Sequence, residues 1–128
     1  MNSHEAPRNV LDFIERLIDS VPELEALLLL REDESRGWSD AEVAARIYVS
    51  REEAARVLET LHRRGLIAAA GETPLYSFKP AREDMRGIVA EVADAYRRHL
   101  ISIAVYIHRK SSASVREFAR AFDLKKER

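Results

Sequence analysis

The sequence predicts a mainly helical, α+β protein with one small β-hairpin, and two observations support this fold class. The first is the motif Ser-x-x-Glu, which recurs at Ser20, Ser39, Ser50 and Ser114. It is typical of a helix start, because the serine oxygen accepts from the glutamate amide while the glutamate carboxylate accepts from the serine amide. The second is a pair of strand-like runs, LIAAA and PLYSF, separated by GET. Such a pair predicts a hairpin that turns near Gly71.

Three helices are expected in the first part of the chain. Apolar residues between Val10 and Ile18 recur at helical spacing, which predicts a short amphipathic helix. After Ser20, the run PELEALLLLRE predicts a buried helix with its proline in the first turn, where a missing amide hydrogen costs nothing. Ser39 then opens the short helix AEVAARIY.

A longer helix follows at once, through a tight link at Val49 and Ser50. Its apolar face carries Ala54, Val57, Leu58 and Leu61. Gly65 stands just beyond it, in the position of a left-handed C-cap. The order helix, short helix, tight turn, longer helix and hairpin is that of a winged helix-turn-helix.

From about residue 81 the sequence predicts one long helix that continues to about residue 109. Its apolar stripe comprises Met85, Val89, Val92, Tyr96, Leu100, Ile103 and Ile107. The stretch LISIAVYI would suit a strand if considered alone, but continuity of the helical period favours a helix. The stripe could pack onto the winged helix within the chain or pair with a second copy. We expect the second arrangement, a homodimer.

The chain is therefore divided into residues 1–80, a winged-helix domain with its N-terminal helix, and residues 81–128, a C-terminal helical dimerisation element with a basic tail. VREFARAF predicts a final amphipathic turn or two within that tail. The charge differs between the two parts. Through residue 80 there are 10 Lys and Arg against 15 Asp and Glu, and from residue 81 onward 11 against 7. An acidic front part opposes binding to phosphates.

Composition indicates a globular protein. The 128 residues are 46% hydrophobic, which is enough for a packed core. With no cysteine there is no disulfide and no thiolate zinc site. The start MNSHEAPRN does not read as a secretory signal, and LISIAVYI is far shorter than the roughly 20 residues that cross a bilayer. We expect a soluble, cytoplasmic protein without membrane contact.

The stretch AEVAARIYVSREEAARVLETLHRRGLIAAAGETPLYSF resembles the winged-helix domain of bacterial MarR-like and ArsR-like transcriptional regulators. The resemblance covers roughly residues 22–80, and its most specific parts are the Val-Ser link and the sequence GLI that leads into the wing. It implies that the helix after Ser50 faces the DNA major groove. The DNA-contacting residues implied are Arg51, Ala55, Arg56, Thr60, Arg63 and Arg64.

Several residues of this helix also have a purely structural interpretation. Glu53 is explained by the capping box, and Glu52 suits the positive end of the helix dipole. Arg63 and Arg64 suit the negative end. The wing departs from the regulator pattern, because Glu72 stands at its tip where a cation commonly reaches the minor groove.

The sequence offers no chemistry of an enzyme. The histidines His4, His62, His99 and His108 lack the i, i+4 spacing of a metal site. There is no Gly-rich phosphate loop and no nucleophile elbow. We therefore expect no catalytic residue, no metal and no cofactor. The first hypothesis is a dimeric transcriptional regulator that binds double-stranded DNA. The alternative is a winged-helix module that binds a protein partner in a transcription or chromosome-associated assembly and does not bind DNA.

Overall fold

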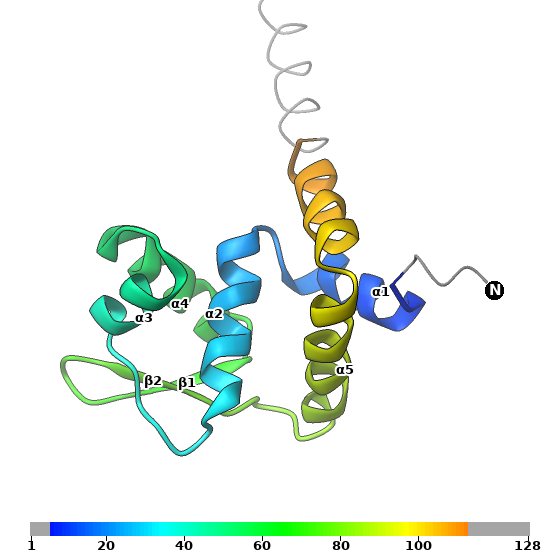
Figure 1. Cartoon of the computed structure of the whole chain (residues 1–128). Helices are drawn as coiled ribbons and strands as arrows, with labels where there is room; N and C mark the ends of the chain where they lie inside the picture. The colour runs from blue at the N-terminus through cyan, green and yellow to red at the C-terminus, as the bar shows by residue number, and fades with distance from the viewer. Residues whose placement is uncertain (1–5, 113–128) are drawn as a thin grey trace, which may run out of the picture.

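The structure, a computed structural model, describes residues 6–112. Its elements are α1 (Arg8–Leu17), α2 (Val21–Glu32), α3 (Asp40–Ile47), α4 (Arg51–Arg63), β1 (Ile67–Ala70), β2 (Leu75–Phe78) and α5 (Met85–Arg98). Residues 100–112 are helical as well. Figure 1 shows α2 in the middle, with α3, α4 and the hairpin on one side and α1 and α5 on the other. The predicted fold class is confirmed. The Ser114 capping motif, VREFARAF and the basic tail lie outside the described residues.

The serine caps form at each described position, but only one capping box is complete. The Ser39 hydroxyl accepts from the Glu42 amide at 3.1 Å, and the Glu42 carboxylate accepts from the Ser39 amide at 2.9 Å. Ser20 and Ser50 also accept from the amide three residues later. The Glu23 carboxylate, however, accepts from the amide of Asp19 and not from that of Ser20. Serine at these positions therefore starts the helices whether or not the glutamate returns the bond.

One residue with a left-handed backbone conformation precedes α4 and another follows it, and only the one that follows is a glycine. Gly65, at φ 76°, follows the helix, and the Leu66 amide donates to the Leu61 carbonyl while the Gly65 amide donates to that of His62. This is a Schellman ending, as the sequence predicts. Before α4, Tyr48 adopts φ 61° and ψ 47° at the end of α3. This conformation could not be predicted from the sequence, because tyrosine rarely adopts it.

The wing has one more partner than the sequence predicts. β1 and β2 pair antiparallel with Ile67 opposite Phe78, and Gly71 turns the hairpin at φ 93°. In addition, Trp38 forms an isolated bridge with Tyr76, through two backbone hydrogen bonds of 2.8 Å. The segment before α3 is thereby attached to the hairpin, so the helix-turn-helix and the wing are held together.

The core is continuous from α1 to the segment after α5. Its fully buried side chains include Ile14, Leu24, Leu30, Leu58 and Ile103. The proposed division at residue 80 stays a prediction, but residues from both sides of it share this core. No helix in residues 6–112 is long and apolar enough to cross a membrane.

The prediction of one uninterrupted C-terminal helix is wrong. The first helix, α5, begins at Met85 and ends at Arg98, where His99 leaves the helical conformation at φ −129° and ψ 42°. The His99 carbonyl then accepts from the Ile103 amide at 3.0 Å, so a second helical segment starts at the break. This second segment reaches the end of α1, where the Lys110 ammonium donates to the carbonyls of Ile14 and Ile18.

The break also bears on the two interpretations of the apolar stripe. Val89, Val92, Ile103 and Ile107 are buried within the single chain. These four residues therefore pack in the core of the single chain, and their assignment to a dimer interface stays a prediction. Met85 and Tyr96 are partly buried against the same core. Of the predicted interface residues, only Leu100 remains largely open, at 48% exposed.

Burial predicts that replacement of Ile103 lowers stability strongly, whereas replacement of the nearby Ile101 hardly changes it. Ile103 is fully buried and Ile101 is 72% exposed. Replacement of Ile103 by alanine should lower the free energy of unfolding by about 2–5 kcal/mol, because it leaves a cavity in the core. Replacement of Ile101 by alanine should change it by less than about 0.5 kcal/mol. Urea denaturation of both variants measures the difference, and equal effects would contradict the burial described above.

Candidate nucleic-acid interface

The outer face of α4 carries alternating charges. Since a helix turns by about 100° per residue, the exposed residues fall on the side opposite the buried ones. We call four of these exposed residues the outer stripe; they are Glu52, Arg56, Glu59 and Arg63. Among residues 6–112, none of the four takes part in an ion pair. The outer stripe therefore offers two arginines to a partner, each beside a glutamate.

The remaining predicted contact residues on this face are less available. Arg51 is exposed but pairs with Asp40 of α3, with 3.0 Å between Nε and Oδ1. Ala55 and Thr60 are half-buried, and the Thr60 hydroxyl accepts from the Arg63 guanidinium at 3.1 Å. Arg51 can reach a phosphate only by sharing its charge with Asp40.

Arg64 is used inside the fold. Its side chain is 24% exposed, and its guanidinium donates to Glu23 at 2.6 Å, to Asp19 at 2.7 Å and to the Leu17 carbonyl. We therefore remove Arg64 from the predicted DNA contacts, because these acceptors already take its donors. The arginine instead ties the end of α4 to the junction between α1 and α2.

The same junction receives the segment after α5. The Lys110 ammonium lies 2.9 Å from the Asp19 carboxylate, and the Ser111 hydroxyl donates to the Asp19 carbonyl at 2.6 Å. We call Asp19, Glu23, Arg64 and Lys110 the junction cluster. The hydrogen bond from Lys110, together with Arg64, holds the pKa of Asp19 below its usual value, although partial burial opposes this shift. Asp19 therefore stays ionised and connects two distant parts of the chain.

Tyr48 lies at the surface of the protein, two residues before Ser50, the cap of α4. Its side chain is 93% exposed, and no hydrogen bond or ring contact within residues 6–112 involves it. A left-handed backbone costs a non-glycine residue about 1–2 kcal/mol. One signal in the sequence points to a turn at this position, namely the tight link at Val49 and Ser50.

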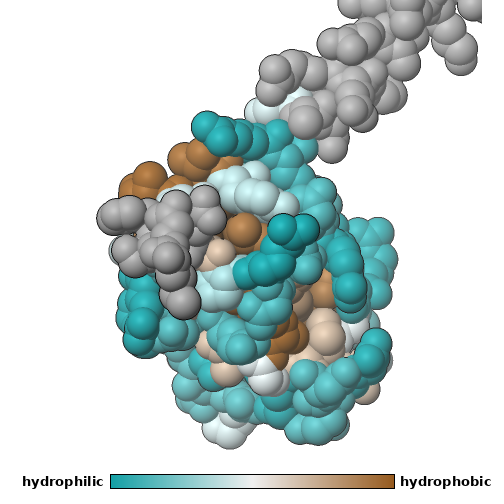
Figure 2. All heavy atoms as spheres, turned by 90° about the vertical axis from the view of Figure 1, so that its right-hand side faces the viewer, coloured by the Kyte–Doolittle hydropathy of each residue, from teal (hydrophilic) through white to brown (hydrophobic). Residues whose placement is uncertain are grey.

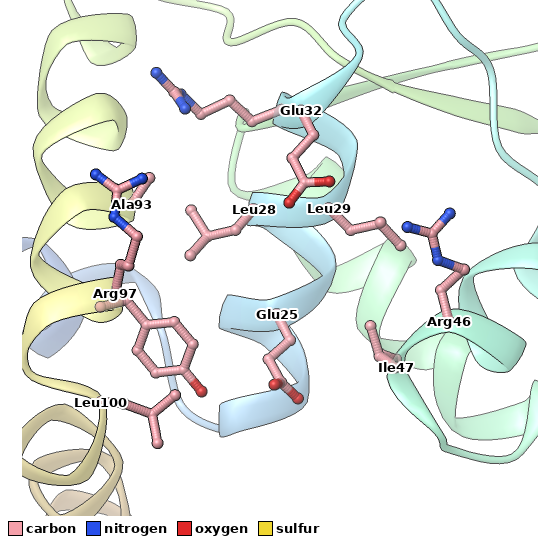
Figure 3. A pocket seen from close by; sticks show the side chains of 11 residues that line it. Glu25, Leu28, Leu29, Glu32, Arg46, Ile47, Ala93, Arg97 and Leu100 are labelled. Carbon is pink, nitrogen blue, oxygen red and sulfur yellow. The ribbon is translucent and has the colours of Figure 1, made fainter.

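A hollow lies between the helix-turn-helix and α5. It has a volume of about 490 Å³ and is floored by Leu28 and Leu29 of α2. Figure 3 shows Arg46 of α3 and Arg97 of α5 on opposite sides, with Glu25 and Glu32 of α2 between them. The lining is of mixed charge, and any molecule held there would touch both the helix-turn-helix and α5. Among the described residues, no group of three or more His, Asp or Glu side chains is arranged to hold a metal ion.

Several solved structures have a similar arrangement of elements, and transcriptional regulators are among them. The M. tuberculosis transcriptional regulator MosR is 20% identical and superposes with a TM-score of 0.55, over 88% of this chain and 82% of that one. A MarR-family regulator from Rhodococcus sp. RHA1 is 18% identical with a TM-score of 0.53, over 89% and 80%. An S. aureus MepR mutant bound to an oligodeoxyribonucleotide is 10% identical with a TM-score of 0.55, over 90% and 88%. The sequence matches no protein-family model and no curated protein.

The chain has the winged-helix fold of MarR-family regulators. Of the two regulator families that the sequence resembles, MarR is the one named among these structures. The fold assigns α3 and α4 to the helix-turn-helix and the β1–β2 hairpin to the wing. On the wing, Glu72 stands at the tip, as the sequence predicts, and is exposed. Lys79 is exposed beyond β2.

The junction cluster predicts a pH-dependent contribution to stability. A carboxyl with a lowered pKa in the folded state stabilises the fold above its unfolded pKa, about 3.9, and this contribution is lost as the pH falls through the folded value. Asp19→Asn should therefore lower the free energy of unfolding by about 1 kcal/mol at pH 7, discounted for the exposure of Asp19. The difference from the wild type should shrink below about pH 4.

Thermal denaturation between pH 7 and pH 3 makes this measurement. The control is Asp12→Asn, which removes only an exposed i, i+4 pair with Arg8 and should change stability little. A difference between Asp19→Asn and the wild type that stays constant across the pH range would show that the charge of Asp19 is not what stabilises the junction.

Proposed function

We propose that the protein is a transcriptional regulator that binds double-stranded DNA with its winged helix and acts as a homodimer. The observation that carries this proposal is the exposed pair Arg56 and Arg63 on a helix that the fold assigns to the helix-turn-helix. Guanidinium groups bind phosphates and the edges of guanine bases. The fold is shared with transcriptional regulators and with MepR, which was solved bound to an oligodeoxyribonucleotide.

The glutamates of the outer stripe limit the affinity of this surface. Glu52 and Glu59 stand one turn from Arg56, on the same exposed side. Their charges repel phosphates, so the interface neutralises few of them. Because counterion release scales with the number of neutralised phosphates, we expect modest affinity and a shallow dependence on salt.

Charge changes on the outer stripe test the DNA-binding proposal in both directions. Arg56→Ala should weaken binding to random duplex DNA and flatten the logarithmic salt dependence by about one unit if Arg56 contacts a phosphate. Loss of a base contact should instead relax specificity by about 1–3 kcal/mol. The double variant Glu52→Gln, Glu59→Gln should bind several-fold more tightly at low salt, because two repulsive charges are removed.

Fluorescence anisotropy with labelled duplexes at two salt concentrations measures these changes. The matched control is Arg8→Ala, since Arg8 is also exposed but lies on α1, on the far side of the molecule from α4 (Figure 1). If the wild type does not bind DNA even at low salt, or if all the outer-stripe variants bind like the wild type, the regulator proposal is wrong.

The outer stripe also suits the alternative function. Alternating acidic and basic side chains complement a protein surface of the opposite pattern better than a uniformly negative phosphate backbone. A protein-binding winged helix would use the same four residues without any contact to DNA. Loss of partner binding in the Glu52, Glu59 double variant, with no DNA binding by the wild type, would favour this module.

We propose that two copies associate through a smaller apolar surface than the stripe that the sequence predicts. Leu100, Ile101 and Val105 remain exposed at 48%, 72% and 41%, and all three lie in the helical segment after α5. Figure 2 shows apolar patches that interrupt the polar surface on the side formed by α1 and α5. Large apolar side chains gathered in one segment favour contact with a second copy.

A charge placed on this surface should separate the copies without unfolding them. We expect Leu100→Asp to convert the dimer to a monomer, while the melting temperature of the monomer stays close to that of the wild type. Leu75→Asp is the matched control, because Leu75 is 46% exposed on the wing, away from this segment. Sedimentation at about 10–50 μM, a range suited to interfaces of modest affinity, measures the change. A wild type that is already monomeric there would refute the dimer.

A further inference from the structure

We infer that Tyr48 is a DNA-contacting residue whose phenol hydroxyl donates to a phosphate oxygen. The inference rests on the proposed function and adds to it a neutral contact that the sequence analysis did not include. Two observations carry it, the exposure of the side chain and the conformation of its backbone. They are independent, because one concerns what the side chain touches and the other what the fold requires at this position.

The exposure shows that the side chain serves no contact within the described fold. Tyr48 is 93% exposed, whereas its neighbours Ile47 and Val49 are partly buried against the core. The two neighbours fix the backbone, so the tyrosine between them is directed outward. Its ring and its hydroxyl are therefore both open to contact with a partner, and tyrosine is a residue type enriched at interfaces.

The backbone conformation makes tyrosine an unfavourable choice for the fold alone. Tyr48 is the only non-glycine residue with a positive φ in residues 6–112, at 61°. Glycine adopts this conformation without steric cost, and asparagine tolerates it better than an aromatic residue. Residues held in strained conformations gather at functional sites, where the surrounding structure fixes them. The turn here is fixed by bonds from the amides of Tyr48 and Val49 to the Ala44 carbonyl.

The position of Tyr48 identifies the partner. It lies two residues before Ser50, the cap of α4, and α3, α4 and the wing share the side of the molecule opposite α5 (Figure 1). At the start of α4, Arg51 is paired with Asp40 and Glu52 is acidic. A phosphate approaching this edge therefore meets no unshared cation at the first turn. A tyrosine hydroxyl supplies a donor there, and such contacts position proteins on DNA without reading its sequence.

A neutral hydrogen-bond donor and an arginine affect the salt dependence of DNA binding differently, so an experiment can distinguish the two kinds of contact. Tyr48→Phe should weaken binding to random duplex DNA about 3- to 10-fold, the effect of one neutral hydrogen bond. The salt dependence should not change, because a phenol displaces no counterion, whereas loss of a phosphate-contacting arginine flattens it. Tyr106→Phe is the matched control. It also removes a hydroxyl, one that donates to Glu15 at 2.7 Å, and should leave DNA binding unchanged.

Stability provides a second measurement that does not depend on DNA. Tyr48→Gly should raise the melting temperature by about 2–4 °C, because it relieves the left-handed strain, and should weaken DNA binding at least as much as Tyr48→Phe. Tyr48→Ala keeps the strain and should not gain stability. Opposite effects of one substitution on stability and binding are the signature of a residue kept for contact and not for folding.

The outcomes are distinguishable from those of the proposed function. If the wild type binds DNA and Tyr48→Phe binds equally well, the inference is overturned while the regulator proposal stands. A lower melting temperature for Tyr48→Gly would overturn it too, because Tyr48 would then serve the fold. Absence of DNA binding by the wild type overturns both proposals.

Discussion

The arrangement of the helices depends on how the junction between α1 and α2 is held. Two cations from distant parts of the chain converge on it, Arg64 from the end of α4 and Lys110 from the segment after α5, and both meet the Asp19 carboxylate. Each also takes main-chain carbonyls at the end of α1. The Ile14 carbonyl also accepts from the Ile18 amide. The carbonyls of Leu17 and Ile18 lie at the end of the helix, where no further helical amide follows, so the two cations satisfy groups that would otherwise be costly to bury. The end of α4 is thus fixed relative to the segment after α5.

This constraint explains why the C-terminal region bends instead of continuing straight. A straight helix would carry the apolar stripe past the end of α1. The break at His99 redirects the chain, so that Ile103 and Ile107 enter the core and Lys110 reaches Ile14 and Ile18. The outcome for self-association follows directly. Val89, Val92, Ile103 and Ile107, which the sequence suggested for a second copy, are buried within the chain, and Leu100, Ile101 and Val105 remain exposed on the bent segment.

Much of the fold could be predicted from the sequence because its signals are local. Serine caps, the left-handed glycine after α4 and the hairpin turn each act within a few residues, and all of them form. The features that could not be predicted are contacts between distant segments. Arg64 reads as a DNA-binding or dipole-stabilising arginine until Asp19 is placed beside it, and Trp38 reads as a loop residue until Tyr76 pairs with it. Periodicity alone, likewise, cannot tell a stripe that faces the chain's own core from one that faces a partner.

The charge balance of α4 links the proposed contact surface to self-association. With Arg64 used in the fold and Arg51 shared with Asp40, one winged helix offers Arg56 and Arg63 as its unshared cations on this face, accompanied by Glu52 and Glu59. So few phosphate contacts give weak binding on their own. Joining two copies makes the second contact intramolecular and can raise the overall affinity by about 10²–10⁴ without any new contact. For the proposed regulator, assembly through the segment after α5 would therefore govern DNA binding, and the junction cluster is the rigid connection between that segment and α4.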